Sequence, residues 1–350
     1  MRKLFRLSWL LLSMASLHFA GAAYGAQVFS DGSDGAYDPS VNGDCTVTTC
    51  RLTLDADGVF NFTTVNIPAG YTVYFIRNVA NSPAVIAATG DITIAGTLEA
   101  SAYITDLTNP QFAIAEAPKR GGGPGGFDGG LRGTPGSPLG LPGDGPAGGA
   151  NGDPAGGGGH ATPGGVGTRY GGSPGAGGAQ IGPADPLRGG SGGGGGNIGY
   201  SFGVPLDAGH GGGGGGAVQL STPTAIDISG RIGANGANGG WSFANVFASG
   251  GEGGGGAGGM IELYGGSIDL TGSLEVIGGY GGGLGTQPYT NDPAAFTSFG
   301  DGGLGYVRIE TNVFNNAGTI DAQVVPLPAA AGLLGLPLLV LATNRRKRNS

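Results

Sequence analysis

Acidic side chains recur at matching places along this 350-residue chain, and they are the groups best suited to chemistry. Asp227 and Asp269 occupy the same position in two similar stretches, "AIDISG" and "SIDLTG", and Glu99, Glu275 and Asp321 share another. Facing carboxylates can bind Ca²⁺, or serve as general acid and base in sugar cleavage. Because apolar residues flank these acids, we expect them to point outward into solvent. Weak calcium binding at Asp227 and Asp269 is the secondary hypothesis, and no other cofactor is expected.

Few lysine or histidine side chains are available to assist these acids in catalysis. Lys119 is the one lysine between the two ends of the chain, and His160 and His210 lie apart in glycine tracts. The glycine runs match nucleotide-binding fingerprints by chance, but none stands between a strand and a helix, and no Gly-Lys-Ser/Thr occurs. We therefore predict no catalytic residues, and the alternative is a carbohydrate-active lyase or hydrolase.

Two cysteines occur, Cys45 and Cys50 in "DCTVTTC". A lone close pair in an exported protein is most simply a disulfide that closes a small hairpin-like loop, and free thiols are the alternative.

The charge of the chain is uneven. All 24 acidic residues lie between positions 26 and 325, whereas seven of the 16 basic residues lie outside that range. The body therefore holds nine basic and 24 acidic residues, a net charge of −15. Such a polyanion repels nucleic acid, so we exclude nucleic acid as a partner.

Strand signals return along the chain. Residues 59–102, 217–236, 260–279 and 306–323 are rich in β-branched and aromatic residues in short alternating runs. Four stretches align, "DITIAGTLEA", "AIDISGRIGA", "SIDLTGSLEV" and "FNNAGTIDAQ", and matching positions in the second and third lie 42 residues apart. The aligned columns are Ile94, Ile228 and Leu270; Gly96, Gly230, Gly272 and Gly318; and Leu98, Ile232, Leu274 and Ile320.

A repeat of this kind indicates one unit stacked on copies of itself. The strands are too short to form stable hairpins alone, but parallel stacking would pair each strand with its counterpart and align the apolar columns in a narrow core. Glycine at the repeated corner allows a sharp bend. The sequence thus predicts an all-β, right-handed parallel β-helix with long Gly-rich insertions, and the alternative is a β-sandwich.

Glycine supplies 82 residues and proline 22, without the every-third-residue pattern of collagen. The predicted organisation is an N-terminal β region (26–118), a Gly/Pro-rich insertion (119–216) and β-helix repeats (217–323). Two interpretations of the insertion remain open: a solvated, flexible loop, which we favour, or polyproline-II-like chains packed on the flank of the body.

The N-terminus has the form of a secretory signal peptide over residues 1–25. Arg2, Lys3 and Arg6 precede an apolar stretch that ends in small residues. We expect its removal, which places the mature chain outside the cytoplasm.

The C-terminal stretch "VVPLPAAAGLLGLPLLVLATNRRKR" joins a proline motif, a hydrophobic span of minimal membrane length and a basic cluster. It resembles the PEP-CTERM sorting signal of Gram-negative bacteria, although Leu327 stands where that family usually has Glu. The matching residues are Val325, Pro326, Leu327 and Pro328, with Arg345, Arg346, Lys347 and Arg348. The resemblance implies a C-terminal sorting signal over residues 324–350, whose hydrophobic span from Val324 to Ala342 forms a transient transmembrane helix at the inner membrane. It also implies cleavage by an exosortase, release to the cell surface or matrix, and a link to exopolysaccharide.

The stretch "DGVFNFTTVNIPAGYTVYF…ATGDITIAGTLEASA", followed by "PGGFDGG", also resembles Gly-rich β-helical bacterial surface proteins. The sequence therefore predicts a secreted, non-enzymatic surface or biofilm-matrix protein that contacts polysaccharide. Exposed aromatic residues could stack on sugar rings or, alternatively, cap the open edge of the core. These residues are Trp241, Phe243, Tyr280 and Tyr289.

Overall fold

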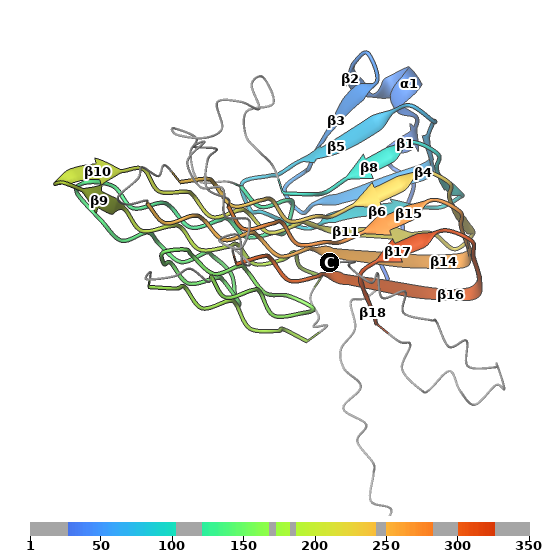
Figure 1. The fold of residues 1–350 in the computed structure, drawn as a ribbon. Coiled ribbons are helices and arrows are strands. Elements are labelled where there is room, and N and C mark those ends of the chain that lie inside the picture. Colours follow the sequence, from blue (N-terminus) through green and yellow to red (C-terminus); the bar gives the residue numbers. More distant parts are fainter. Residues whose placement is uncertain are drawn as a thin grey trace, which may run out of the picture.

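The computed structural model describes residues 27–102, 121–167, 173–182, 187–242, 250–282 and 300–325. These residues form two adjoining parts: a body of stacked strands and a bundle of extended glycine-rich segments (Figure 1). The predicted all-β class is confirmed, because α1 (Pro39–Asn42) is the one α-helix in the described ranges.

The body contains two sheets in which strands from distant parts of the sequence lie side by side. The larger sheet holds β1 (Gly35–Tyr37), β4 (Val59–Ile67), β6 (Ala84–Ala88), β7 (Ile92–Ile94), β11 (Ala217–Ser221), β12 (Ala225–Ile228), β14 (Met260–Leu270), β16 (Tyr306–Asn316) and β18 (Gln323–Val325). The smaller sheet holds β2 (Asp44–Thr46), β3 (Thr49–Thr53), β5 (Thr72–Ile76), β8 (Thr97–Glu99), β13 (Arg231–Gly233), β15 (Ser273–Glu275) and β17 (Thr319–Asp321).

Pairing is parallel throughout both sheets except in the β2–β3 hairpin. The register follows the repeat in the sequence: Ile228 pairs with Ile94 and Leu270, and Ile232 pairs with Leu98 and Leu274. The predicted columns are therefore confirmed. Because paired strands belong to successive repeats rather than to hairpins, this register argues against the β-sandwich alternative.

The larger sheet has one feature that the repeat did not predict. β14 pairs along its first half with β11 and along its second half with β12, and β4 pairs in the same way with β6 and β7. A long strand in one repeat thus faces two short strands in the next. The pairings of β11, β6, β4, β7, β12 and β14 consequently close into a ring.

We call each pair of connected segments from the two sheets a rung. Five rungs stack: β4 with β5, β6 and β7 with β8, β11 and β12 with β13, β14 with β15, and β16 with β17. Their inward side chains form one core, in which Ile94, Ile228, Leu98 and Ile232 are at most 1% exposed. Burial of this continuous apolar column stabilises strands that are individually too short to persist.

The first rung is covered by β1, by α1 and by the β2–β3 hairpin. Asp38 caps α1 by accepting a hydrogen bond from the Ser40 backbone N–H at 2.9 Å. Tyr37, Phe62 and Phe60 stack in sequence beneath it, with ring centroids 5.2 and 5.6 Å apart. This end of the core is therefore closed by local structure.

The glycine-rich segments form an ordered bundle rather than the solvated loop that we favoured from the sequence. Most of its glycines are buried, and their backbones exchange hydrogen bonds with neighbouring segments. Solvation was expected because glycine buries little apolar surface. That expectation is wrong for the described residues, because backbone hydrogen bonds between segments offset the ordering entropy instead.

Residues 253–259 show how the bundle is built. Their backbone N–H groups donate in turn to three neighbouring segments. The carbonyls of 240, 237 and 234 accept from Gly253, Gly256 and Gly259; those of 194 and 191 accept from Gly254 and Ala257; and those of 300 and 303 accept from Gly255 and Gly258. The chain thus donates to the same neighbouring segment at every third residue. A threefold repeat without internal hydrogen bonds is the pattern of a polyproline-II-like chain, the second interpretation of the insertion over residues 119–216. Within that insertion, Gly190, Gly193 and Gly196 donate in the same three-residue spacing to the carbonyls of 215, 212 and 209.

The same geometry explains the composition. A Cβ added to Gly254 would lie 1.9 Å from the Gly156 carbonyl oxygen, and one added to Gly256 would lie 2.0 Å from that of Gly213. Collagen needs glycine only at the residue that faces its axis, whereas a chain surrounded by neighbours on all sides needs it at almost every position.

The bundle also extends the rungs. After β13 the chain leaves the smaller sheet as residues 234–240, and it returns as residues 250–259 directly into β14. Residues 278–282 and 300–305 make the same excursion between β15 and β16. Bundle segments therefore lie on both sides of the boundary predicted at residue 216.

Candidate functional site

The corner between the two sheets is built on the predicted glycine column. A Cβ at Gly230 would lie 1.9 Å from the Gly96 carbonyl oxygen, and one at Gly272 would lie 1.8 Å from that of Gly230. Hydrogen bonds also join the corner to the adjacent rung: the backbone N–H groups of Ser229 and Gly230 both donate to the Ile94 carbonyl, at 3.1 and 2.9 Å. Each corner glycine therefore rests directly on the backbone of the rung below.

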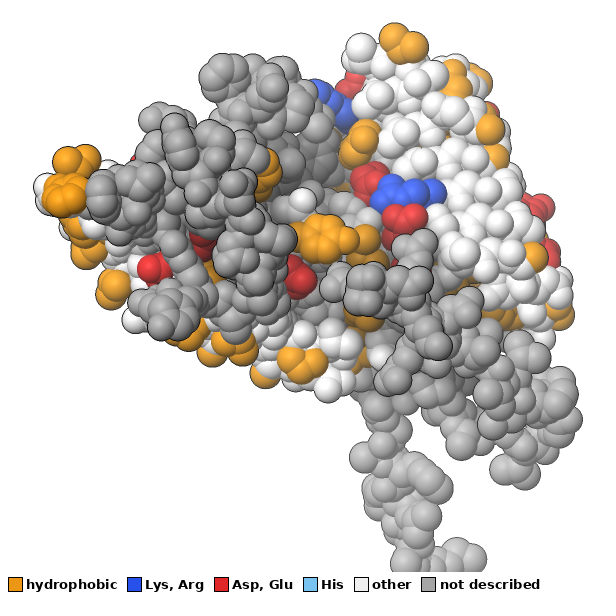
Figure 2. All heavy atoms as spheres, in the orientation of Figure 1, with side chains coloured by type: hydrophobic (Ala, Val, Ile, Leu, Met, Phe, Trp, Pro, Cys, Tyr) orange, Lys and Arg blue, Asp and Glu red, His pale blue; other side chains and the backbone are white. Residues whose placement is uncertain are grey.

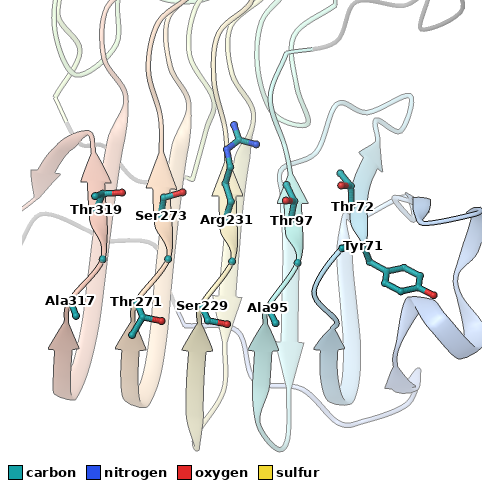
Figure 3. A pocket seen from close by; sticks show the side chains of 15 residues that line it. Tyr71, Thr72, Ala95, Thr97, Ser229, Arg231, Thr271, Ser273, Ala317 and Thr319 are labelled. Atoms are coloured by element: carbon teal, nitrogen blue, oxygen red, sulfur yellow. The ribbon is translucent and has the colours of Figure 1, made fainter.

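This close stacking leaves a groove of about 480 Å³ that crosses all five rungs. Because no side chain rises from the glycines, the groove floor is backbone, and the walls are the residues on either side of each corner (Figure 3). One wall carries a polar side chain from each rung, and these residues lie in one row across the strands (Figure 3). They are Thr72, Thr97, Arg231, Ser273 and Thr319.

Arg231 is the charged member of that wall, and two acids from adjacent rungs bind it. It forms ion pairs with Glu99 and with Glu275, the latter at 2.7 Å between Nε and Oε2. Burial by itself lowers the pKa of Arg231, but the charges and hydrogen bonds of the two carboxylates outweigh burial and raise that pKa above its usual range. The three groups therefore form one compact charged cluster.

Gly233 makes the cluster possible. It pairs with both Glu99 and Glu275 in the strand register, so it occupies the place of a third side chain in the acidic column. A Cβ there would lie 2.6 Å from Glu99 Oε1. The sequence correctly placed Glu99, Glu275 and Asp321 in one column, and the structure brings the guanidinium of Arg231 between the first two.

Asp227 and Asp269 are direct neighbours in the register, as the repeat predicts. Asp227 is exposed, and Asp269 accepts a hydrogen bond from Asn315 Nδ2 at 2.6 Å. No group of three or more His, Cys, Asp or Glu side chains arranged to hold a metal occurs among the described residues. Calcium binding at this pair stays a prediction.

The other predicted site residues do not line the groove. Cys45 and Cys50 form a disulfide across the β2–β3 hairpin. Val325 ends β18, and the rest of the sorting motif, Pro326, Leu327, Pro328 and Arg345 to Arg348, lies outside the described residues, as does the signal peptide. No described helix is long and apolar enough to cross a bilayer.

Among the predicted aromatic residues, Trp241 and Tyr280 are exposed at the bundle, by 47% and 63%. Phe243 and Tyr289 lie outside the described residues. Since neither described ring lines the corner groove, stacking of sugar rings on them would require a second contact surface.

The histidines have structural partners that the sequence did not reveal. His160 is 1% exposed, and its Nδ1–H donates to the Gly258 carbonyl at 2.8 Å, while its ring meets the edge of Tyr306. His210 Nδ1 accepts from the Arg132 backbone N–H at 3.2 Å. Burial is the main cause that lowers the pKa of His160 to about 4, so the ring is neutral at pH 7.

Sequence reasoning missed the hydroxyl row of the groove. Its signal is present, because Thr97, Ser273 and Thr319 each follow a corner glycine in "AGT", "TGS" and "AGT". The glycines of these triplets align the repeat, but the alignment alone assigns no role to the residue that follows each of them.

No family model, no curated protein and no solved structure matches this chain.

Proposed function

We propose that this chain is an exported, non-enzymatic structural protein of the bacterial surface or extracellular matrix, and that it binds a linear polysaccharide along the corner groove. Its sorting signal would direct processing by an exosortase, after a transient stay in the inner membrane of a Gram-negative bacterium. One observation carries the proposal: polar side chains of five successive rungs line one side of a groove whose floor is backbone.

The spacing of the groove suits a polymer. Paired strands lie about 4.8 Å apart, so the polar side chains of the wall repeat at that interval, with a hydroxyl group on four of the five rungs and Arg231 on the middle one. Hydroxyls both donate and accept hydrogen bonds, which matches the hydroxyl-rich edge of a sugar chain. A linear polymer can thus make similar contacts with two rungs on each side of Arg231, and these weak hydrogen bonds add together.

The charge of the groove favours a neutral polysaccharide. Arg231 is the one cation among the groove residues, and Glu99 and Glu275 already bind it. An anionic polymer would meet two carboxylates beside a guanidinium that is already neutralised, within a strongly acidic chain.

The architecture that best accounts for this groove is the right-handed parallel β-helix. Parallel pairing between successive repeats and one continuous core support it, whereas the ring of pairings in the larger sheet is a departure from a simple coil. The glycine bundle would then form the third side of the coils between β8 and β16, whereas residues 77–83 lead from β5 to β6.

The alternative is a carbohydrate-active enzyme on the same frame. Glycoside cleavage needs two carboxyl groups that face the scissile bond. The two acids at the groove, Glu99 and Glu275, instead accept hydrogen bonds from Arg231, which favours binding over cleavage.

Co-sedimentation with insoluble neutral glycans tests the proposal. The triple variant Thr97→Val, Ser273→Ala and Thr319→Val removes three hydroxyls with little change in shape, and we expect it to weaken binding about tenfold or more. Thr64→Val, at an exposed threonine outside the groove, is the matched control. Equal binding by the triple variant and the control would refute the groove as the site, and shortening of the glycan would favour the enzyme.

A further inference from the structure

The outer layer of the glycine bundle is built from three neighbouring segments, 234–241, 276–282 and 300–305. The N–H groups of Gly239 and Gly302 donate to the carbonyls of Tyr280 and Gly279, both at 2.8 Å, so 276–282 is the central segment. All three also hydrogen-bond to the buried segment 253–259. One side of this layer therefore packs on the bundle, and the other side faces outward.

Each segment exposes side chains that lie three residues apart. The sequence reads "NGGW" at 238–241, "IGGY" at 277–280 and "DGGL" at 301–304. Both outer residues of each stretch are exposed, while the two glycines between them are buried or half-buried. A polyproline-II-like chain has three residues per turn, so these side chains leave the layer on one side. We call Asn238, Trp241, Ile277, Tyr280, Asp301 and Leu304 the platform.

Hydrogen bonds hold the middle of the platform in place. Ile277 and Tyr280 are each bound by an Asn-Gly pair of the neighbouring segment, Asn235-Gly236 and Asn238-Gly239. In both cases the asparagine Oδ1 accepts from the N–H of the exposed residue, at 2.9 Å. The glycine N–H donates to the carbonyl of the same residue, at 2.9 and 2.8 Å. The platform is thus preorganised, and binding a ligand orders little of the chain.

The aromatic residues of the platform suit a sugar chain. Trp241 and Tyr280 are 47% and 63% exposed, and an aromatic ring with a polar tip matches the apolar face and hydroxyl rim of a sugar ring. Tyr280 lies level with Asn238, three residues before Trp241, so the two aromatic residues are offset by about 9 Å at about 3.1 Å per residue. A short oligosaccharide can therefore contact both rings.

The charge of the platform favours a neutral glycan over an anionic one or a second copy of the chain. Asp301, whose Oδ1 accepts from the Gly281 N–H at 2.9 Å, is the one charged member of the platform. The chain between residues 26 and 325 carries a net charge of −15. An anionic polymer or a facing copy would therefore be repelled.

The platform continues the outer face that carries the corner groove. Ser273 lines the groove, Glu275 binds Arg231, and Ile277 is the next outward residue of the same stretch, because the residues between them are buried. Figure 2 shows a cluster of basic and acidic side chains with apolar side chains beside it. The groove crosses the rungs, whereas the platform follows segments of the bundle, so the two surfaces bind separately.

We propose that the platform is a second contact surface for a neutral polysaccharide, on which Trp241 and Tyr280 stack against sugar rings. The class of the ligand rests on the proposed function, whereas the platform itself does not depend on the groove.

Fluorescence of Trp241 reports on the platform directly. The chain has two tryptophans, so Trp9→Phe in the full chain leaves Trp241 alone. We expect cellohexaose, laminarihexaose or maltohexaose to shift the emission of Trp241 in a saturable way, because stacking removes the indole ring from water. The shift should persist in the groove variant Thr97→Val, Ser273→Ala and Thr319→Val.

Substitutions at Tyr280 test the second ring. Tyr280→Ala should raise the Kd measured from Trp241 emission about fivefold or more, whereas Tyr280→Phe keeps the ring and should hold the Kd within about twofold. The matched control is Tyr200→Ala. Tyr200 is 49% exposed in the hairpin of β9 (Gly199–Ser201) and β10 (Val204–Leu206), whose exposed tip at Gly203 lies at the far end of the bundle (Figure 1). Because both tyrosines are exposed, each variant should melt like the parent chain.

Four results would overturn the platform. The first two are an emission that none of the three sugars shifts and a Kd that Tyr280→Ala leaves unchanged. The third is an emission that shifts with protein concentration without sugar, which would indicate a contact between copies. The fourth is loss of the shift in the groove variant, which would assign the sugar to the groove alone. Since co-sedimentation tests the groove and Trp241 emission tests the platform, failure of one is distinguishable from failure of the other.

Discussion

A Cβ on Gly230 would lie 1.9 Å from the carbonyl oxygen of Gly96, its neighbour in the adjacent rung. Gly230 is thus required by the close approach of two backbones at the corner. Because glycine has no side chain, it also leaves the floor of the groove open. Glycine at this position therefore serves both the stacking of the rungs and the proposed binding surface.

Gly230→Ala should therefore destabilise the body strongly. The clashing atom is backbone and cannot move aside without displacing the rung, so we expect a loss of about 3 kcal/mol in the free energy of unfolding, at the upper end for overpacking. Denaturant titration measures it. Gly136→Ala is the control, because nothing lies within 4 Å of a Cβ there, and its effect should stay below about 0.5 kcal/mol. Similar midpoints for the two variants would show that the corner relaxes freely.

Ile228→Asp tests the core column. Ile228 is 1% exposed and pairs in register with Ile94 and Leu270, so the variant buries an unpaired carboxylate among apolar side chains. We expect a loss above about 4 kcal/mol and disappearance of the β-sheet circular dichroism signal. Asp227→Asn, at the exposed neighbour, should leave the spectrum unchanged. A soluble Ile228→Asp variant that melts like the parent chain would mean that this side chain does not face inward.

The body could be predicted from the sequence because its periodicity is carried by side chains. Alternating apolar residues mark which face of a strand is buried, and Gly96, Gly230 and Gly272 mark the corner, so the register follows from aligning the stretches. The ring of pairings could not be predicted. In one repeat a turn separates β11 from β12, whereas in the next repeat the matching residues form the single strand β14, and the sequence alone does not show that β14 is continuous.

The bundle left no comparable pattern in the sequence. In each chain of the bundle, the hydrogen-bond direction repeats every three residues. Neighbouring chains lie close in all three directions, so glycine is needed at almost every position. The three-residue repeat therefore does not show in the sequence. Whether a glycine run is solvated or packed depends on its neighbours, and these come from segments such as 191–194 and 300–303 that are distant in sequence.

Hydrogen exchange distinguishes a packed bundle from a solvated one. The amides of residues 253–259 each donate to another segment, at 2.7 to 3.0 Å, although no strand or helix contains any of these seven residues. We expect them to exchange orders of magnitude more slowly than an unstructured glycine peptide, with protection like that of β14. Mass spectrometry of peptides from this region measures it, and the exposed tip peptide around Gly203 serves as the fast-exchanging reference. Complete exchange at the earliest time would contradict the packing.

Acid should weaken the junction of bundle and body through His160. The unfolded imidazole has a pKa near 6.5, and burial lowers the folded value to about 4, with a further lowering by the charge of Arg188. A depressed folded pKa means that the unfolded state binds the proton more tightly. Stability is therefore complete above about pH 6.5 and falls as the pH drops towards 4, by on the order of 3 kcal/mol.

Denaturant unfolding of the parent chain and of His160→Gln between pH 7.5 and 4 measures this dependence. The variant cannot titrate at position 160, so its stability should fall less over the same interval, whatever its stability at pH 7.5. Parallel curves for the two proteins would assign the acid sensitivity to carboxylates elsewhere and remove His160 from the explanation.

The C-terminal stretch should be removed in the native host. Pro326 and Pro328 keep the entry to the hydrophobic span extended, and the basic cluster from Arg345 to Arg348 halts export with the motif at the outer face of the inner membrane. Mass spectrometry of the protein from the surface or medium should find a C-terminus near Val325-Pro326. Neutral replacements for the four basic residues should impair retention and leave unprocessed chain in the medium, whereas Arg51→Gln, which alters the charge of the body at an exposed position, should not affect processing. Recovery of the chain ending at Ser350, confined to the inner membrane, would leave a tail-anchored protein in place of a sorted one.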